Sequence, residues 1–193
     1  EVPHSLVVMS TKGAHGWTRY LLGSNAVSVL HSVDVPVLVI PETCLWNGRS
    51  KEPMKWMLAV DPSDTSYELA IAWLQRLAGH LNSQISPGYV VDDTERSVEV
   101  EYFLQWASVH FPNQDPLMVV SENPGTGIND LMLQSKADGL MMIARDKGWL
   151  RDLLRRHTTD EVVFMGRYPV LVVPERSAIF ENAPVPTGSG AVH

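Results

Sequence analysis

Two stretches of the chain follow nearly the same pattern. The first has an apolar run at 6–9, Gly-Trp at 16–17 and Val-Pro-Val-Leu-Val-Ile-Pro-Glu at 35–42. The second has an apolar run at 140–143, Gly-Trp at 148–149 and Tyr-Pro-Val-Leu-Val-Val-Pro-Glu at 168–175. Self-similarity of this kind predicts two copies of one strand–loop–helix–strand unit. Only the second copy is preceded by enough sequence to complete a domain, so the chain is expected to hold one whole domain and the closing part of another.

The repeat divides the chain into four expected parts. These are the closing part of a first domain at 1–42, a linker at 43–54, a complete second domain at 55–175 and a flexible tail at 176–193. The apolar runs lack alternation, which is typical of parallel strands covered on both faces. In the complete domain we expect strands at 56–60, 89–91, 117–120, 140–144 and 169–173. Helices are expected between them, from about 65, 94, 124 and 149.

Five strands alternating with four helices predict an α/β fold. The sheet is expected to be doubly wound, five-stranded and parallel, with a partial strand–helix–strand copy added at the amino terminus. Helical spacing of apolar residues predicts the buried sides of three helices. The expected stripes are Leu69, Trp73, Leu77 and Leu81, then Val98, Tyr102, Trp106 and Val109, and finally Ile128, Leu131 and Met132.

Composition narrows the classes of function. The net charge of −7 over 193 residues argues against a broad nucleic-acid surface, which requires clustered Lys and Arg. The apolar runs are shorter than the roughly 18 residues of a membrane-spanning helix, so no membrane partner is expected. The single cysteine, Cys44, cannot form an internal disulfide, which favours the reducing cytoplasm.

A glycine-containing loop follows the first apolar run. It includes Gly13 and Gly16 and is followed by Gly23, Ser24 and Asn25. Glycines after a strand leave backbone N–H groups uncovered, and the next helix adds the positive end of its dipole, so such a loop suits a phosphate. A tight strand-to-helix turn without a ligand explains the same pattern, and the spacing matches neither common phosphate-binding motif.

Residues 6–42 resemble the carboxy-terminal part of a universal stress protein domain. The resemblance lies in the order of strand, Gly-x-x-Gly loop, Gly-Ser, helix and Pro-Val-Leu-Val strand. It implies an adenine nucleotide alpha hydrolase-like fold, with ATP held by Gly13, Gly16, Gly23, Ser24 and Asn25. Residues 55–175 resemble a second whole domain, which implies a tandem member of the family. There the resemblance assigns Asp61 a place beside the nucleotide, although a helix cap is an equal interpretation.

The second copy lacks most of the glycines. Its loop reads Ala-Arg-Asp-Lys-Gly at 144–148, so we expect its nucleotide pocket to be degenerate. The basic cluster around it could seat another anion, or it could be a solvated helix face, which we favour. Its members are Arg145, Lys147, Arg151, Arg155, Arg156 and His157.

The resemblance implies a cytoplasmic stress-response protein that binds an adenine nucleotide in its first domain. It is expected to be no enzyme, or at most a weak ATPase. Family members pair through their last strands, so 35–40 is expected to pair antiparallel with 169–173, as a pseudo-dimer within one protein or as self-association between chains. The first copy lacks the opening strands of its domain, and part of its pocket would come from upstream sequence or another polypeptide. A nucleotide-independent interaction module with a degenerate pocket is the alternative.

Overall fold

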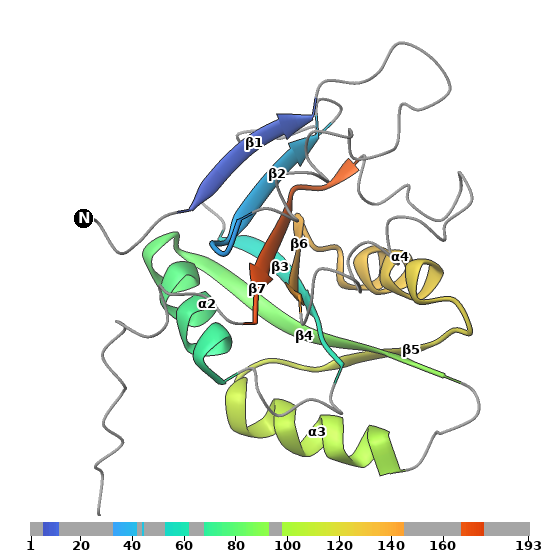
Figure 1. Ribbon diagram of the computed structural model, residues 1–193. Helices are drawn as coiled ribbons and strands as arrows, with labels where there is room; N and C mark the ends of the chain where they lie inside the picture. Colours follow the sequence, from blue (N-terminus) through green and yellow to red (C-terminus); the bar gives the residue numbers. More distant parts are fainter. Residues whose placement is uncertain are drawn as a thin grey trace, which may run out of the picture.

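The described residues form one seven-stranded sheet with helices packed on both faces (Figure 1). The structure, a computed structural model, describes residues 6–11, 33–41, 44, 53–61, 68–92, 98–144 and 167–175. The strands are β1 (Val7–Thr11), β2 (Val37–Pro41), β3 (Met54–Ala59), β4 (Ser83–Val91), β5 (Leu117–Val120), β6 (Gly139–Ala144) and β7 (Val170–Pro174). The described helices are α2 (Glu68–His80), α3 (Val98–His110) and α4 (Pro124–Ser135).

The strand order β1-β2-β7-β6-β3-β4-β5 confirms the predicted α/β fold. Strands β3 to β7 are parallel to one another and form the expected five-stranded sheet. Within it the chain moves outward from β3 to β4 and β5, then returns to the other side of β3 for β6 and β7. Strands β1 and β2 are parallel to each other and extend the same sheet, with one antiparallel junction between β2 and β7.

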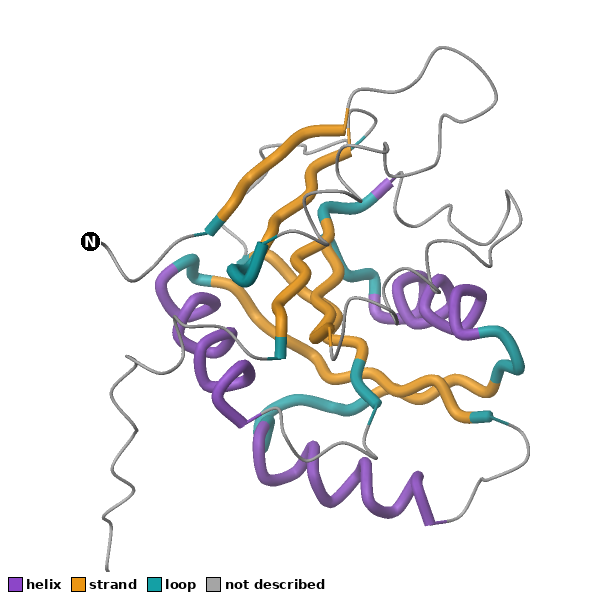
Figure 2. The backbone as a smooth tube through the Cα atoms, in the orientation of Figure 1, coloured by secondary structure: helices purple, strands orange, loops and turns teal. Residues whose placement is uncertain are grey.

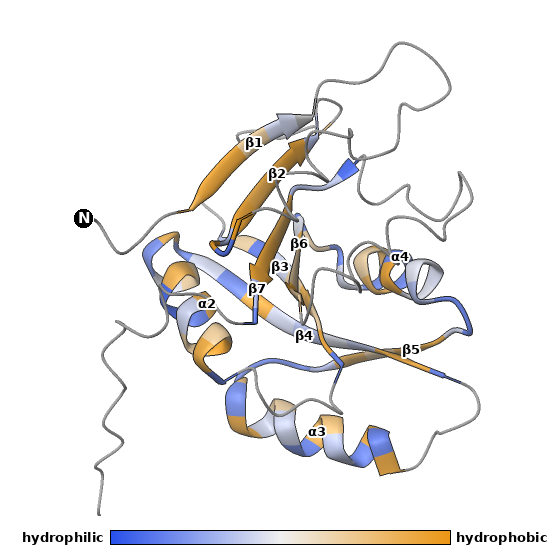
Figure 3. Cartoon of the chain, viewed as in Figure 1, coloured by the Kyte–Doolittle hydropathy of each residue, from blue (hydrophilic) through white to orange (hydrophobic). Residues whose placement is uncertain are grey.

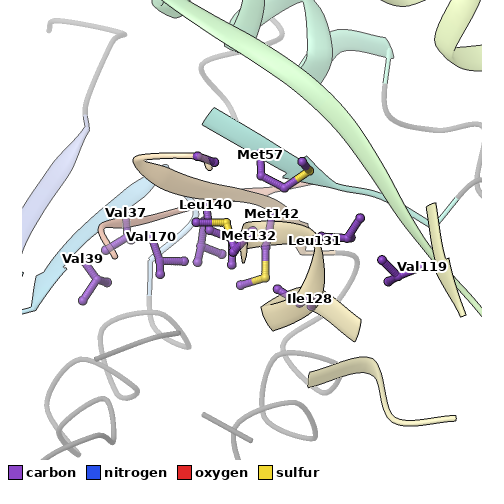
Figure 4. Close-up of a cluster of buried hydrophobic side chains, with 12 residues drawn as sticks. Val37, Val39, Met57, Val119, Ile128, Leu131, Met132, Leu140, Met142 and Val170 are labelled. Atoms are coloured by element: carbon purple, nitrogen blue, oxygen red, sulfur yellow. The ribbon is translucent and has the colours of Figure 1, made fainter. Parts of the chain in front are cut away.

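Two layers of helix enclose the sheet (Figure 2). Helix α4 packs on one face, where Ile128, Leu131 and Met132 join a cluster with Met57 and Met142 (Figure 4). These three α4 residues are the ones that the sequence predicts to be buried. Helix α2 covers the opposite face, where its Ile71 and Leu74 pack with strand residues such as Leu58, Met141 and Leu171. Helix α3 covers the same face farther along, with Phe103 and Ala107 against Tyr89 and Val91.

The predicted buried stripes of α2 and α3 are only partly right, because Trp73, Leu77 and Trp106 are partly buried against the core but the other predicted residues are exposed. In α2 the outer residues Leu69 and Leu81 are exposed, and the buried residues are Ala70, Ile71, Leu74 and Ala78. In α3, Val98 is 77% exposed and Val109 is 69% exposed, whereas Phe103 and Ala107 are buried. Both helices carry apolar residues on more than one side (Figure 3), so spacing alone does not decide which side meets the sheet. The small alanines mark the true contact because they allow close approach.

Strand β4 begins six residues before the predicted start at Tyr89. Its first half carries the polar residues Ser83, Gln84 and Ser86 together with Pro87, which hides the strand pattern. Strand β5 pairs with β4 only from Gly88 onward, so this half lies at an edge of the sheet. A proline is tolerated there because its missing N–H would face no partner strand.

Candidate functional site

The two copies of the repeat have the same strand pairing. Val7 lies opposite Val37, and Leu140 lies opposite Val170, with equal separation along the chain. The hydrogen bonds repeat as well. The N–H of Val7 donates to the carbonyl of Pro36 at 3.0 Å, and the N–H of Leu140 donates to the carbonyl of Pro169 at 2.9 Å. Positions of β1 and β2 therefore have equivalents in β6 and β7, with Val7 equivalent to Leu140.

An approximate twofold axis relates the copies. Leu38 of β2 lies opposite its own equivalent, Leu171 of β7, in the antiparallel junction. On either side, Val37 pairs with Val172 and Val39 pairs with Val170. The axis runs through the Leu38–Leu171 pair, perpendicular to the sheet, which makes the junction self-complementary. The antiparallel strand pairing expected from the sequence is thus present within the chain.

The antiparallel junction places the carboxyl ends of the two copies at opposite edges of the sheet. Strand β1 ends at Thr11, shortly before the glycine loop that begins at Gly13. Strand β6 ends at Ala144, directly before the basic stretch that begins at Arg145. In doubly wound sheets ligands bind beyond the carboxyl ends of the strands. The protein therefore has two candidate sites, one at each edge.

Asp61 belongs to the second of these edges. It follows β3, and the preceding Val60 donates its N–H to the carbonyl of Gly88 at 3.0 Å. Strand β3 pairs with β6 on one side and β4 on the other, so Asp61 lies at the point where strand order reverses. Four strand spacings of about 4.8 Å separate β1 from β3. Asp61 and the end of β1, which precedes the glycine loop, therefore lie at opposite edges of the sheet, consistent with the assignment of Asp61 and the loop to different domains.

The edge that holds Asp61 is acidic among the described residues. Asp92 follows β4 and Glu122 follows β5, and all three carboxylates are exposed. The N–H of Ser121 donates to the carbonyl of Val91 at 3.0 Å, which continues the sheet to this edge. Sequence reasoning missed Asp92 and Glu122, although each follows closely on a predicted strand. Carboxylates repel phosphate, so an anion bound here requires neutralisation by the cationic residues after Ala144.

The amino end of α4 borders the same edge. Asn123 caps the helix, and its side-chain oxygen accepts a hydrogen bond from the N–H of Thr126 at 3.1 Å. The hydroxyl of Ser121 donates to the carbonyl of Asn123 at 2.8 Å. Gly127 is buried in the first turn, where an added Cβ would lie 2.3 Å from a methyl of Val90. The helix end is thus fixed by its cap and by close contact with β4.

Most predicted site residues lie outside the described part of the chain. They are Gly13, Gly16, Gly23, Ser24, Asn25, Arg145, Lys147, Arg151, Arg155, Arg156 and His157. The helices expected to follow residues 16 and 149 lie outside it too. Within the described ranges, no group of three or more His, Cys, Asp or Glu residues is arranged to hold a metal ion. None of the described helices is long and apolar enough to cross a membrane.

Comparison with known proteins identifies both repeats. The model of the Universal stress protein family matches residues 1–41 and 54–174. A universal stress protein from Archaeoglobus fulgidus DSM 4304 is similar in structure, with a TM-score of 0.61 and 19% identity. A putative universal stress protein from Pseudomonas aeruginosa UCBPP-PA14 gives a TM-score of 0.65 and 16% identity. The functionally unknown protein PA1789 from P. aeruginosa PAO1 gives a TM-score of 0.64 and 15% identity.

These likenesses extend over most of this chain but only part of the solved proteins. The matches cover 88–91% of this chain and 60%, 64% and 65% of the A. fulgidus, PA1789 and UCBPP-PA14 proteins. The chain therefore spans less than two thirds of the length of each of these structures. No curated protein matches the sequence at a significant level.

Proposed function

The chain belongs to the universal stress protein family, and we propose that it is a stress-response protein that binds an adenine nucleotide, ATP, at the glycine loop of its first copy. The observation that carries this proposal is the shared register of β1–β2 and β6–β7. It makes β1 the equivalent of β6, the fourth strand of a doubly wound sheet. The loop after that strand borders the crevice where such sheets bind ligands.

The sequence after β1 suits a triphosphate. Gly13 and Gly16 leave backbone N–H groups uncovered for phosphate oxygens, and a side chain at either position would take up that space. Gly23, Ser24 and Asn25 add donors for the remaining phosphate or ribose oxygens. The second copy has Ala144 and Arg145 where the first has Thr11 and Lys12, and no glycine at the position of Gly13. Together with the exposed carboxylates Asp61, Asp92 and Glu122, this argues against a second nucleotide at the other edge.

Binding rather than catalysis is the proposed activity. Transfer or hydrolysis of a phosphoryl group requires a positioned base, a metal ion or a lysine that reaches the γ-phosphate. The sequence offers no motif for such a set near the glycine loop. A weak ATPase is the most that the proposal includes, and the cytoplasm is the proposed location. Nucleotide occupancy would then control association with partners through the strands beside the loop.

Isothermal titration calorimetry with ATP tests the proposal. We expect a measurable binding heat for the protein and its loss in a Gly13→Val/Gly23→Val double variant, because two valines would fill the space of the phosphates. Gly148→Val is the matched control, since it changes the one glycine that the second copy retains. This control should leave the heat unchanged. Equal heats from the protein and the double variant would contradict binding at the glycine loop.

A nucleotide-independent interaction module is the second candidate. It is favoured by the self-complementary junction of β2 and β7, which is an assembly surface already used within the chain. Under this alternative neither the protein nor its variants give a heat with ATP. Any ligand would then be an anion or an acidic protein surface bound by the basic residues after Ala144.

A further inference from the structure

The outer side of α3 carries an apolar stripe that no other described element covers. Val98 is 77% exposed, Val109 is 69% exposed and Tyr102 is 38% exposed. The opposite side of the helix, with Phe103 and Ala107, packs on the sheet. Helix α3 lies on the outside of the molecule (Figure 1), over β4 and away from β1 and from the junction of β2 with β7. This surface is therefore separate from the glycine-loop site and from the strand pairing within the chain.

The stripe has the spacing of a coiled-coil seam. Its positions are 98, 102, 105 and 109, which are separated by four, three and four residues. Alternating steps of three and four residues keep side chains in one line that faces a second helix. The two valines at its ends lie about 16 Å apart along the helix axis, and Tyr102 and the exposed Gln105 lie between them. The stripe therefore suits a short contact with one other helix.

The stripe is complementary to itself when one of two helices is reversed. In an antiparallel pair related by a twofold axis, Val98 faces Val109 of the other copy, and Tyr102 faces Gln105. The one polar residue of the seam then lies opposite a hydroxyl group, which can donate a hydrogen bond to the amide oxygen of the glutamine. A parallel pair sets each residue against its own copy and lacks this match. Self-complementarity of this kind is what a twofold interface requires.

The acidic residues of α3 favour the same orientation. Glu99 and Glu101 lie in the first turn of the helix. A parallel pair would bring four carboxylates together at one end of the contact, where they would repel one another. An antiparallel pair moves the two acidic turns to opposite ends. It also brings Glu101 near the exposed Ser108 of the other copy, whose hydroxyl can donate a hydrogen bond to a carboxylate.

Contacts at both ends hold α3 in position for such a pairing. At its start, the hydroxyl of Tyr89 donates a hydrogen bond to the carboxylate of Glu99. At its end, the side chain of Gln75 in α2 donates to the carbonyl of His110. Because the helix is already formed and anchored, pairing does not have to offset the entropy of ordering it.

We propose that α3 pairs with α3 of a second copy of this chain, antiparallel and about a twofold axis, through Val98, Tyr102, Gln105 and Val109. The contact is small, since a standard interface has roughly 20–30 residues on each side, and the association is therefore weak and dependent on concentration. The inference is independent of nucleotide binding.

Disulfide cross-linking between two single-cysteine variants tests the pairing. In a Cys44→Ser background, which removes the natural thiol, one protein carries Val98→Cys and the other carries Val109→Cys. Both positions are exposed, so neither change should disturb folding. Under mild oxidation the mixture should form a dimer with one chain of each kind, identified by mass. Its yield should exceed that of like-with-like dimers at least about tenfold, because only facing positions come within disulfide reach.

Leu133→Cys provides the matched control, because it is a similarly exposed apolar position on α4. Mixed with the Val109→Cys protein, it reports random collisions and should give no excess of the mixed dimer. Equal yields from the control and test mixtures would overturn the proposal. Val98→Cys chains that link to each other as efficiently as to Val109→Cys chains would overturn it too, because that result requires a parallel pair or no fixed orientation.

Sedimentation equilibrium measures the association itself. Val98→Lys/Val109→Lys places lysines opposite each other at both ends of the contact and should raise the dissociation constant of the dimer at least about tenfold. Leu133→Lys is the control and should leave the constant unchanged. An unchanged constant in the double variant would overturn the proposal. So would an unmodified protein that remains a monomer at every concentration up to about 1 mM.

Discussion

Strands β1 and β6 are equivalent in sequence pattern and in pairing, yet they differ in what surrounds them. β6 lies between β7 and β3, and all its residues from Gly139 to Ile143 are buried. β1 has β2 on one side and no strand of the described residues on the other, and Val8 is largely exposed. The difference teaches that an apolar strand sequence indicates burial in a complete domain. Whether the strand is actually buried depends on the strands beside it.

The largest expected difference between the strands comes from a lysine at equivalent positions. Met141→Lys would bury an unpaired charge and should lower the free energy of unfolding by at least about 4 kcal/mol, or abolish folding. Val8→Lys should change it by less than about 0.5 kcal/mol, because the side chain already meets water. Urea unfolding followed by tryptophan fluorescence measures both. Comparable losses would show that β1 is buried in solution.

The next effect concerns the position where the two strands differ in residue size. Gly139→Leu gives β6 the leucine that β1 has at the equivalent position. It should lower the free energy of unfolding by about 3 kcal/mol, because the leucine side chain would collide with Trp56. Leu6→Gly, the reverse exchange, should cost about 1 kcal/mol or less. Adding Trp56→Ala to Gly139→Leu should give a double variant more stable than the sum of the single losses predicts. A strictly additive double variant would refute the steric explanation.

A smaller effect tests the twofold axis itself. Val39 and Val172 are equivalent and both buried in the junction. Val39→Ala and Val172→Ala each remove two buried methyl groups. Each should lower the free energy of unfolding by about 2 kcal/mol. Thermal unfolding should give losses that agree within about 0.5 kcal/mol. Losses that differ by more would show that the junction is symmetric in register but not in packing.

The smallest expected effect concerns the two edge strands of the sheet, β1 and β5. Val120 lies on β5, the edge strand opposite β1, and is 54% exposed. Val120→Lys should change stability by less than about 0.5 kcal/mol, as Val8→Lys does. Light scattering at rising concentration separates the edges. If only Val8→Lys suppresses association, β1 is the edge strand through which molecules associate. Equal suppression by both variants would contradict that distinction.

The strands were more predictable than the helix faces. β5 has the predicted bounds, and β3, β6 and β7 begin or end within two residues of them, because buried parallel strands are continuous apolar runs. α3 was predicted to bury Val98 and Val109, but Phe103 and Ala107 face the sheet. A helix that is apolar on several sides leaves this choice to tertiary packing. The start of β4 was hidden because an edge half-strand tolerates polar residues and Pro87.

The two candidate sites were predictable in their main parts, but the carboxylates Asp92 and Glu122 were missed because a single acidic residue after a strand forms no motif. The glycine loop and Asp61 were identified because each follows an apolar strand. Their separation follows from the antiparallel pairing of β2 with β7, which was predicted from the resemblance to the family and not from the repeat pattern alone. The pairing of Val37 with Val172 reverses one copy relative to the other. The end of β1 before the glycine loop and Asp61 thereby lie at opposite edges of the sheet.

The junction at Leu38 and Leu171 also sets how binding events can influence one another. Strands β1 and β6 run in opposite directions, so molecules bound after their carboxyl ends would lie at opposite edges of the sheet. Within the described residues the copies are joined by the ladder of β2 and β7 and by side-chain clusters on both faces of the sheet, and either can transmit an influence between the two ends. The two candidate binding ends, which face opposite ways, are thus parts of one continuous sheet.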